Sequence, residues 1–211
     1  MLFRSGLHLA ACLLVCGCAP APFVVADPSY RAERGQSWVL VVDLPREAEL
    51  ATPSRQVGRL VTMELGARWF NVLDRDLLVR AVPELGVLLA EAARQVAIGQ
   101  RVSPECVDRL ASRHGVGQLL VVDVFRYEQH WGRETRITRV GVEGRLVQLA
   151  EGRTLWQGRY DPEISDAPGR GYDAATRRAA SELVRLLSDG WPRLQDTPAA
   201  SWPVVDYFTP N

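Results

Sequence analysis

The order of apolar and polar residues predicts alternating strands and helices that begin near residue 37. Residues 37–44 (Ser-Trp-Val-Leu-Val-Val-Asp-Leu) form a nearly continuous apolar run. Such a run is typical of a strand buried on both faces. The apolar residues that follow recur at helical spacing, and Thr52-Pro53 suits a helix N-terminus. The predicted apolar face of this helix holds Val57, Leu60, Val61 and Leu65.

The middle of the chain favours further helices. A short strand is expected over 69–73, and Asp74 can cap the helix that follows it, whose apolar side is expected to hold Leu77, Leu78 and Ala81. Pro83 interrupts this helix, which resumes over 84–98. Ser103-Pro104 opens another helix by the same combination of a cap and a proline, and it ends near residue 115.

Three strands rich in Val, Leu and aromatic residues are predicted between Gly117 and Tyr160. The first turn between them is expected over Gln129–Arg136, and the second over Ala150–Arg153. A loop over 162–171 follows, and Asp173 can cap a last helix that ends before Pro192. Its inward positions are expected to be Ala179, Leu183, Leu186 and Leu187.

The predicted order is β-α-β-α-α-β-β-β-α. Helices cluster early and long strands come late, which indicates the α+β fold class. We expect residues 37–192 to form one domain, with residues 193–211 as a Pro-rich tail. The tail contains three aromatic residues, which we expect to contact protein rather than the lipid interface: Trp202, Tyr207 and Phe208.

The N-terminus has the pattern of a targeting signal. A short basic start precedes an apolar stretch over 7–15 that is too short to span a membrane. Cys18, with Gly17 before it and Val15 three residues before it, resembles the cysteine of a bacterial lipobox. Residues 1–17 are then a signal peptide, and Cys18 is the lipidation site. Cys16 fits less well because Val15 would precede it directly, and an ordinary secretory signal is the alternative.

Residues 18–36 are interpreted as the lipidated cysteine and a Pro-rich tether. The stretch 19–36 reaches at most about 60 Å when fully extended. The lipobox resemblance, with no aspartate after Cys18, favours the periplasmic face of the outer membrane. If the signal is removed, Cys106 is the one thiol left, so no intrachain disulfide is expected. Cys106 lies in a helical pattern and is interpreted as a small buried residue.

Composition removes several classes of function. The chain has 25 acidic and 25 basic residues, so its net charge of zero argues against a nucleic-acid partner. Every basic residue is arginine, which excludes a Schiff-base lysine, a Ser-Lys dyad and a P-loop lysine. His130 and Glu134 could be paired on paper as metal ligands, but a third ligand is missing. We expect no metal, no cofactor and no catalysis, and an envelope hydrolase is kept as a third hypothesis.

One group of arginines and aromatic residues is a candidate interaction surface. Planar arginines and aromatic faces suit anionic or sugar polymers and also protein interfaces. The alternative is a solvated hairpin whose arginines pair with Glu128, Glu134 and Glu143. The candidate residues are Arg126, Tyr127, His130, Trp131, Arg133, Arg136 and Arg139.

Four stretches together carry a resemblance to a known family. They are Val-Val-Asp-Leu-Pro at 41–45, Phe-Asn-Val-Leu-Asp-Arg-Asp at 70–76, residues 110–124, and residues 149–158 with Gly-Arg-Thr-Leu-Trp. The series resembles the periplasmic domain of the CsgG-like outer-membrane lipoproteins, a group that includes the curli secretion pore, PelC and LpoB. The resemblance covers residues 37–192. It implies a mixed sheet with helices packed on it, similar to an anticodon-binding domain.

The chain departs from some members of that family. The turn over Gln129–Arg136 is too short and too charged for the membrane-spanning hairpins of the curli pore. The tether is shorter than an LpoB-like activator needs to reach inner-membrane synthases. We therefore expect a PelC-like, non-catalytic accessory component of an envelope export machine, acting as a homo-oligomer or with an envelope protein partner. The alternative is an LpoB-like regulator of a peptidoglycan synthase.

Overall fold

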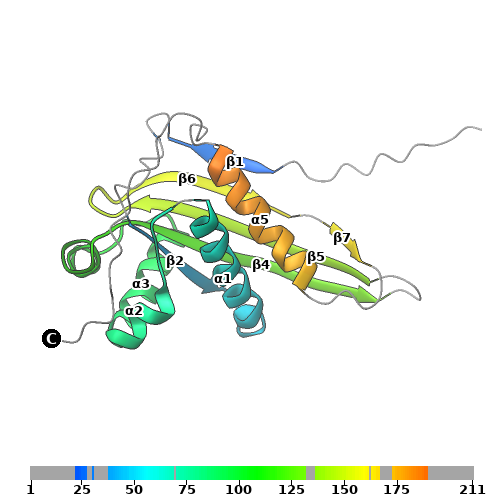
Figure 1. The fold of residues 1–211 in the computed structure, drawn as a ribbon, viewed down its shortest axis with the longest axis horizontal. Coiled ribbons are helices and arrows are strands. Elements are labelled where there is room, and N and C mark those ends of the chain that lie inside the picture. The colour runs from blue at the N-terminus through cyan, green and yellow to red at the C-terminus, as the bar shows by residue number, and fades with distance from the viewer. Residues whose placement is uncertain are drawn as a thin grey trace, which may run out of the picture.

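The computed structural model describes residues 22–27, 30, 38–68, 70–131, 136–161, 163–166 and 173–189. Figure 1 shows how their helices and strands are arranged. The strands are β1 (Phe23–Ala26), β2 (Trp38–Pro45), β3 (Val72–Leu73), β4 (Val116–Trp131), β5 (Arg136–Gln148), β6 (Arg153–Tyr160) and β7 (Glu163–Asp166). The helices are η1 (Ala48–Leu50), α1 (Ala51–Ala67), α2 (Arg75–Ala81), α3 (Leu85–Ala97), α4 (Pro104–Val107), η2 (Asp108–Ser112) and α5 (Asp173–Asp189).

The strands form one mixed sheet in the order β1-β6-β5-β4-β2-β3, and β7 pairs with the far end of β5. β2 runs parallel to both β3 and β4, whereas β4, β5 and β6 form an antiparallel meander. Figure 1 shows β4 and β5 as the longest strands, which extend past the helices at one end of the molecule. The predicted α+β class and the three-strand block are confirmed.

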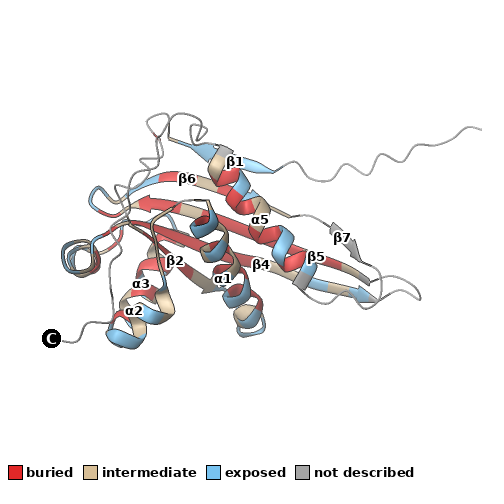
Figure 2. Cartoon of the chain, viewed as in Figure 1, coloured by how far each residue is buried: buried red, intermediate tan, exposed pale blue. Residues whose placement is uncertain are grey.

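Each face of the sheet has its own apolar core. Helices α1 and α5 pack on one face, α1 against β2 and α5 against β5 and β6, and Val57, Val61, Leu183 and Leu187 share one buried cluster with Val39 and Val41 of β2. On the other face, α3 and the α4–η2 segment cover Leu40 and Val42 of the same strand. The buried band along the middle of the sheet is visible in Figure 2. β2 is therefore buried on both faces, as its continuous apolar run predicts.

Several predicted boundaries are confirmed by specific contacts. The Asp74 side chain accepts a hydrogen bond from the Leu77 amide, 3.0 Å away, and so caps α2. Ser103 caps α4 in the same way, through the Cys106 amide at 3.3 Å. α1 differs from the prediction, because it begins at Ala51 after the single turn η1 and Thr52 is not its cap.

The folded domain includes residues that the sequence places in the tether. Phe23–Ala26 forms β1, which pairs antiparallel with β6, and Tyr30 belongs to the buried cluster that α1 and α5 share with the sheet. The expected start at residue 37 is therefore corrected for these residues. The pairing is the physical reason, because β6 supplies hydrogen-bond partners that no local pattern reveals.

Two further corrections concern the long hairpin. The predicted turn over Gln129–Arg136 is strand at both of its ends, since β4 runs to Trp131, and Trp131 pairs with Arg136 of β5. The predicted loop after Tyr160 contains β7, which pairs with Arg136–Arg139. Cross-strand pairing continues both strands beyond the point where their apolar alternation stops. No helix in the described part of the chain is both long and apolar enough to cross a membrane.

Candidate functional site

The predicted Arg and aromatic group is divided between the two faces of the β4–β5 hairpin. Arg126 lies 2.8 Å from Asp161 and 3.5 Å from Glu128. Glu128 is also 3.8 Å from His130 and 3.9 Å from Arg139. These partly exposed groups form a network centred on one carboxylate, as the solvated-hairpin alternative predicts. Surface ion pairs of this kind contribute little to stability.

Tyr127 lies on the other face. Its ring packs against the core beneath α1 and α5, and its hydroxyl receives a hydrogen bond from Gln129, 3.3 Å away. Trp131 and Arg136 face each other across the strand ends in the register of the hairpin. Arg133, the side chains of Trp131 and Arg136, and the lipidation candidate Cys18 lie outside the described residues. Of the four candidates whose side chains are described, Arg126, His130 and Arg139 share one face, and Tyr127 lies on the other.

A second charge network lies nearer the middle of the sheet, and the sequence interpretation missed it. Asp123 and Glu143 are neighbours across β4 and β5, and they are only 5% and 6% exposed. Arg46 binds Asp123, while Arg145 lies 2.8 Å from Glu143. Gln157 of β6 also donates to Glu143, at 2.9 Å. Two carboxylates that would repel each other are thus neutralised by two arginines.

The expected pairing of Glu143 with the hairpin arginines is corrected by this network. Glu143 bonds to Arg145 and approaches Arg46 at 3.9 Å. A bulge between Val124 and Arg126 interrupts the register, so that the hairpin arginines follow a shifted alternation. The signal in the sequence was an inward acid in each of two apolar strands, but only the register shows that the acids meet.

Phe125, the extra residue of the bulge, packs with two arginines. The guanidinium carbon of Arg159 lies 3.9 Å from the centre of its ring, and that of Arg46 lies 6.0 Å away. Both distances fall within the range of cation–π contacts. The ring fills the space where a side chain at Gly141 would begin, with 2.5 Å to the nearest ring atom. The Phe125 ring is therefore packed against Gly141 of β5 and against the guanidinium groups of Arg46 and Arg159.

Burial raises the pKa of the Asp123 carboxyl, and the bond from Arg46 opposes this rise without cancelling it. One oxygen, Oδ1, is buried and has no hydrogen-bond partner among the described residues. A carboxyl with a raised folded-state pKa holds its proton more tightly in the folded chain than in the unfolded chain. Its ionisation therefore opposes folding.

The protonated Asp123 carboxyl therefore stabilises the folded chain. We expect this stabilisation to be fully present below the unfolded carboxyl pKa of about 3.9, and to be lost as pH rises through the raised pKa of Asp123 in the folded chain. The Asp123→Asn variant lacks the titrating group. Its free energy of unfolding should therefore decrease less with rising pH than the free energy of unfolding of the parent protein. Urea denaturation of both proteins across this pH range measures the difference. Parallel pH profiles would contradict a raised Asp123 pKa.

A groove of about 320 Å³ lies between α1 and α2, above the end of β2. Three consecutive residues, Asp74-Arg75-Asp76 of the stretch 70–76, line this groove. Asp74 caps α2, Arg75 pairs with Asp43 of β2, and Asp76 lies 2.9 Å from Arg59 of α1. The hydrogen bond from Arg59 lowers the pKa of Asp76. The Asp-Arg-Asp motif is thus explained as the contacts that hold α2 against α1 and the sheet.

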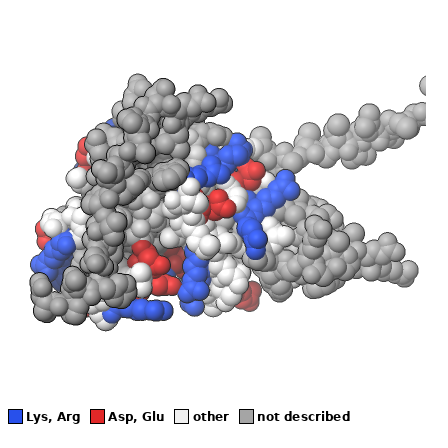
Figure 3. Space-filling model, in the orientation of Figure 1, with Lys and Arg blue, Asp and Glu red and all other residues white. Residues whose placement is uncertain are grey.

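The rim of the groove combines apolar and basic side chains. Met63 of α1 and Leu77 of α2 are exposed there, although the helical pattern of α2 predicts Leu77 on its buried side. Arg55 and Arg80 also line the groove. Figure 3 shows acidic and basic side chains interspersed on this face rather than gathered in a patch of one sign. Such a mixed surface suits contact with protein.

Removing the α2 cap should destabilise the groove. We expect Asp74→Ala to lower the free energy of unfolding by about 1 kcal/mol, because the Leu77 amide loses its acceptor. Asp74→Asn keeps a capping oxygen and serves as the matched control. Thermal and urea unfolding of the two variants measure the effect. Equal losses in both variants would show that charge, and not capping, is the contribution of Asp74.

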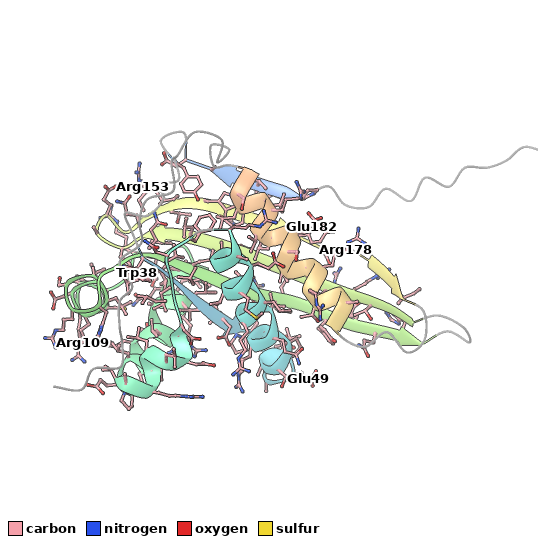
Figure 4. The ribbon with its side chains drawn as sticks, viewed as in Figure 1. Trp38, Glu49, Arg109, Arg153, Arg178 and Glu182 are labelled. Carbon is pink, nitrogen blue, oxygen red and sulfur yellow. The ribbon has the colours of Figure 1, made fainter. Side chains whose placement is uncertain are left out.

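The described residues offer little chemistry beyond these contacts. No three His, Cys, Asp or Glu side chains among them are arranged to hold a metal ion. Cys106 is buried, as predicted, and burial raises the pKa of its thiol to about 11. A thiol with such a pKa stays protonated and is a poor nucleophile. Figure 4 shows the outward-pointing charged side chains, including Glu49, Arg109 and Arg178, spread over separate elements.

Comparison with known proteins gives a fold and no family. No family model matches the chain, and no curated protein matches it. Among solved structures, the PelC dodecamer from Paraburkholderia phytofirmans is similar over 79% of this chain and 96% of its own, with a TM-score of 0.50 and 13% identity. The lipoprotein GNA1162 from Neisseria meningitidis is similar over 72% and 99%, with a TM-score of 0.49 and 18% identity.

The LpoB C-terminal domain from Salmonella enterica is a weaker match, with a TM-score of 0.34 and 12% identity over 62% of this chain and 84% of its own. Of these three likenesses, that to PelC reaches a TM-score that supports an argument, and at 13% identity it shows a shared fold. The α+β fold expected from the sequence resemblance is therefore the fold of PelC. Neither the sequence search nor these structures show the CsgG-like family itself.

Proposed function

We propose that this chain is a non-catalytic lipoprotein, anchored in the outer membrane through Cys18, that works by assembly at the periplasmic face. In this role it is an accessory component of an envelope export machine. The observation that carries the proposal is the fold shared with PelC, whose solved structure is a dodecamer. The lipobox pattern at Cys18 adds the anchor, since attached acyl chains hold a domain at a bilayer by burying their methylenes.

The chemistry of the described residues supports a role in binding rather than catalysis. Asp123 is paired with Arg46 inside the sheet network, and Asp76 is paired with Arg59 beside the groove. The thiol of Cys106 is buried beneath α3. Each of these groups has a shifted pKa that its structural surroundings explain. Structural ion-pair networks and burial produce such shifts, so these three groups need no catalytic role to explain their pKa values.

Digestion of the membrane-extracted protein with trypsin tests the anchor. Cleavage after Arg31 gives the peptide 18–31, and acylation of Cys18 adds the mass of its acyl groups to that peptide. A Cys18→Ser variant should yield no acylated peptide and should leave the membrane fraction. A peptide 18–31 with a free thiol from the parent protein would overturn the anchor.

A regulator of a peptidoglycan synthase is the second candidate, and the groove is the site where it would bind its partner. The groove, with exposed Met63 and Leu77 beside arginines, suits one partner protein as well as a neighbouring copy. Leu77→Asp discriminates between the two candidates. In an export component it should weaken association between copies, whereas in a regulator it should abolish capture of envelope synthases and leave self-association unchanged.

A further inference from the structure

Strand β1 is an apolar edge strand that remains exposed. Its four residues read Phe-Val-Val-Ala, and each of them is exposed. Phe23, Val24 and Val25 keep 55%, 40% and 52% of their surface accessible. β1 pairs with β6 through four residue pairs and forms the end of the sheet order. Figure 2 shows this strand as a pale edge beside the buried sheet.

An uncovered strand of this kind is unusual for a soluble surface. Its outer N–H and C=O groups are a template for pairing, and natural edges are protected by charges, prolines or bulges. β1 is short and follows Pro22, but residues 23–26 themselves carry no charge, proline or bulge, and three of them are large apolar residues. The composition of β1 therefore indicates a surface that is covered in the working protein.

The position of β1 along the chain indicates what covers it. Only residues 19–22 separate Phe23 from Cys18. Five Cα steps span at most about 18 Å. If Cys18 carries lipid, its attachment point lies at the bilayer surface, and β1 cannot lie further than this distance from it. The part of the predicted tether that remains N-terminal to β1 is far shorter than the stretch 19–36.

We propose that β1 is the membrane-contacting edge of the domain, and that its occupant is the headgroup interface of the bilayer. This inference rests on the proposed anchor at Cys18. The headgroup interface suits both the open backbone edge of β1 and its exposed apolar side chains. Phosphate, ester and water oxygens can accept hydrogen bonds from the open backbone edge, which the hydrocarbon core cannot do. Shallow contact of the edge with acyl chains removes the exposed side chains of Phe23, Val24 and Val25 from water.

This placement orients the rest of the molecule. β1 and β3 lie at opposite ends of the sheet, and the groove is lined by β2, by Asp74 directly after β3, and by α1 and α2. Figure 1 shows α1 and α2 away from β1, across the width of the sheet. With β1 at the bilayer, the groove faces away from the membrane and is open to a periplasmic partner. A second copy paired along the open edge of β1 is the competing occupant.

A fluorescent probe at position 24 tests the inference on the membrane-extracted, full-length protein. The protein carries Val24→Cys and Cys106→Ala, and its thiols are labelled with a nitrobenzoxadiazole fluorophore. It is reconstituted into vesicles of phosphatidylethanolamine and phosphatidylglycerol, with or without lipids that bear a spin label near the headgroup. The matched control carries Val87→Cys in place of Val24→Cys. Val87 is an exposed residue of α3, a helix that packs on β2 and not on β1.

The expected result is one label per chain, emission shifted to shorter wavelength at position 24, and loss of that emission in spin-labelled vesicles. The probe at position 87 should keep its emission. One label per chain without quenching at position 24 would overturn the inference while the anchor stands. A shifted but unquenched emission would assign the edge to a second copy. Two labels per chain would show a free Cys18 thiol and overturn the proposed anchor itself.

Discussion

Replacing Trp156 with alanine is expected to lower the free energy of unfolding by about 3–5 kcal/mol, the range for a large aromatic residue in a core. Trp156 is fully buried. Its ring lies over Gly144 and Gly158, which are paired across β5 and β6. Leu183 of α5 approaches the same space at 3.2 Å from the Cβ position of Gly144. The ring therefore joins the sheet to the helix, and its loss leaves a cavity between them.

Two variants separate the cavity from other causes. Trp156→Phe keeps most of the apolar volume and should cost clearly less, because the indole Nε1 has no hydrogen-bond partner among the described residues. Gly158→Ala brings a Cβ to 2.3 Å from the ring and should cost about 1–3 kcal/mol through overpacking. Urea unfolding monitored by circular dichroism measures all three. Equal losses for the alanine and phenylalanine variants would contradict the cavity account.

Replacing Arg145 with alanine should cost about 2–4 kcal/mol, somewhat below the usual range for breaking a buried ion pair. The guanidinium bonds to Glu143 of the same strand and to the carbonyls of Val96 and Ala97, at 3.0 and 2.6 Å. Those carbonyls end α3, so one side chain neutralises a buried acid and fixes a helix C-terminus. Gln157 keeps its bond to Glu143, which limits the loss.

A double variant and a surface control make this prediction specific. Arg145→Ala combined with Glu143→Gln should recover part of the lost stability, because no buried charge is left unpaired. Arg94→Ala removes an exposed arginine that pairs with Glu91, and it should cost less than about 1 kcal/mol. Unfolding free energies that are equal for Arg145→Ala and Arg94→Ala would contradict the role of the sheet network.

The elements that the sequence predicts well are those whose pattern repeats over many residues. Alternation identifies β4, β5 and β6, and helical spacing identifies the buried faces of α1 and α5. Caps at Asp74 and Ser103 are also local signals, because the acceptor and the amide lie three residues apart. For such elements the chain itself carries the information.

The features that the sequence does not predict depend on pairing between distant residues. β1 consists of four residues beside prolines, and it becomes a strand because Phe23 meets Arg159 of β6. The buried pair of Asp123 and Glu143 requires the register of the hairpin. Arg126 and Tyr127 lie on opposite faces because successive strand residues alternate, and the bulge at Phe125 decides which of the two faces the core. The alternation of the apolar residues before the bulge therefore does not predict the faces of the residues after it.

Native mass spectrometry of the complex extracted from membranes in detergent tests the central claim most directly. It reports the mass of each chain and the number of chains in one particle. The proposed function predicts several identical copies, each beginning at Cys18 and each carrying acyl groups. A single unmodified chain would contradict both the lipid anchor and the function by assembly.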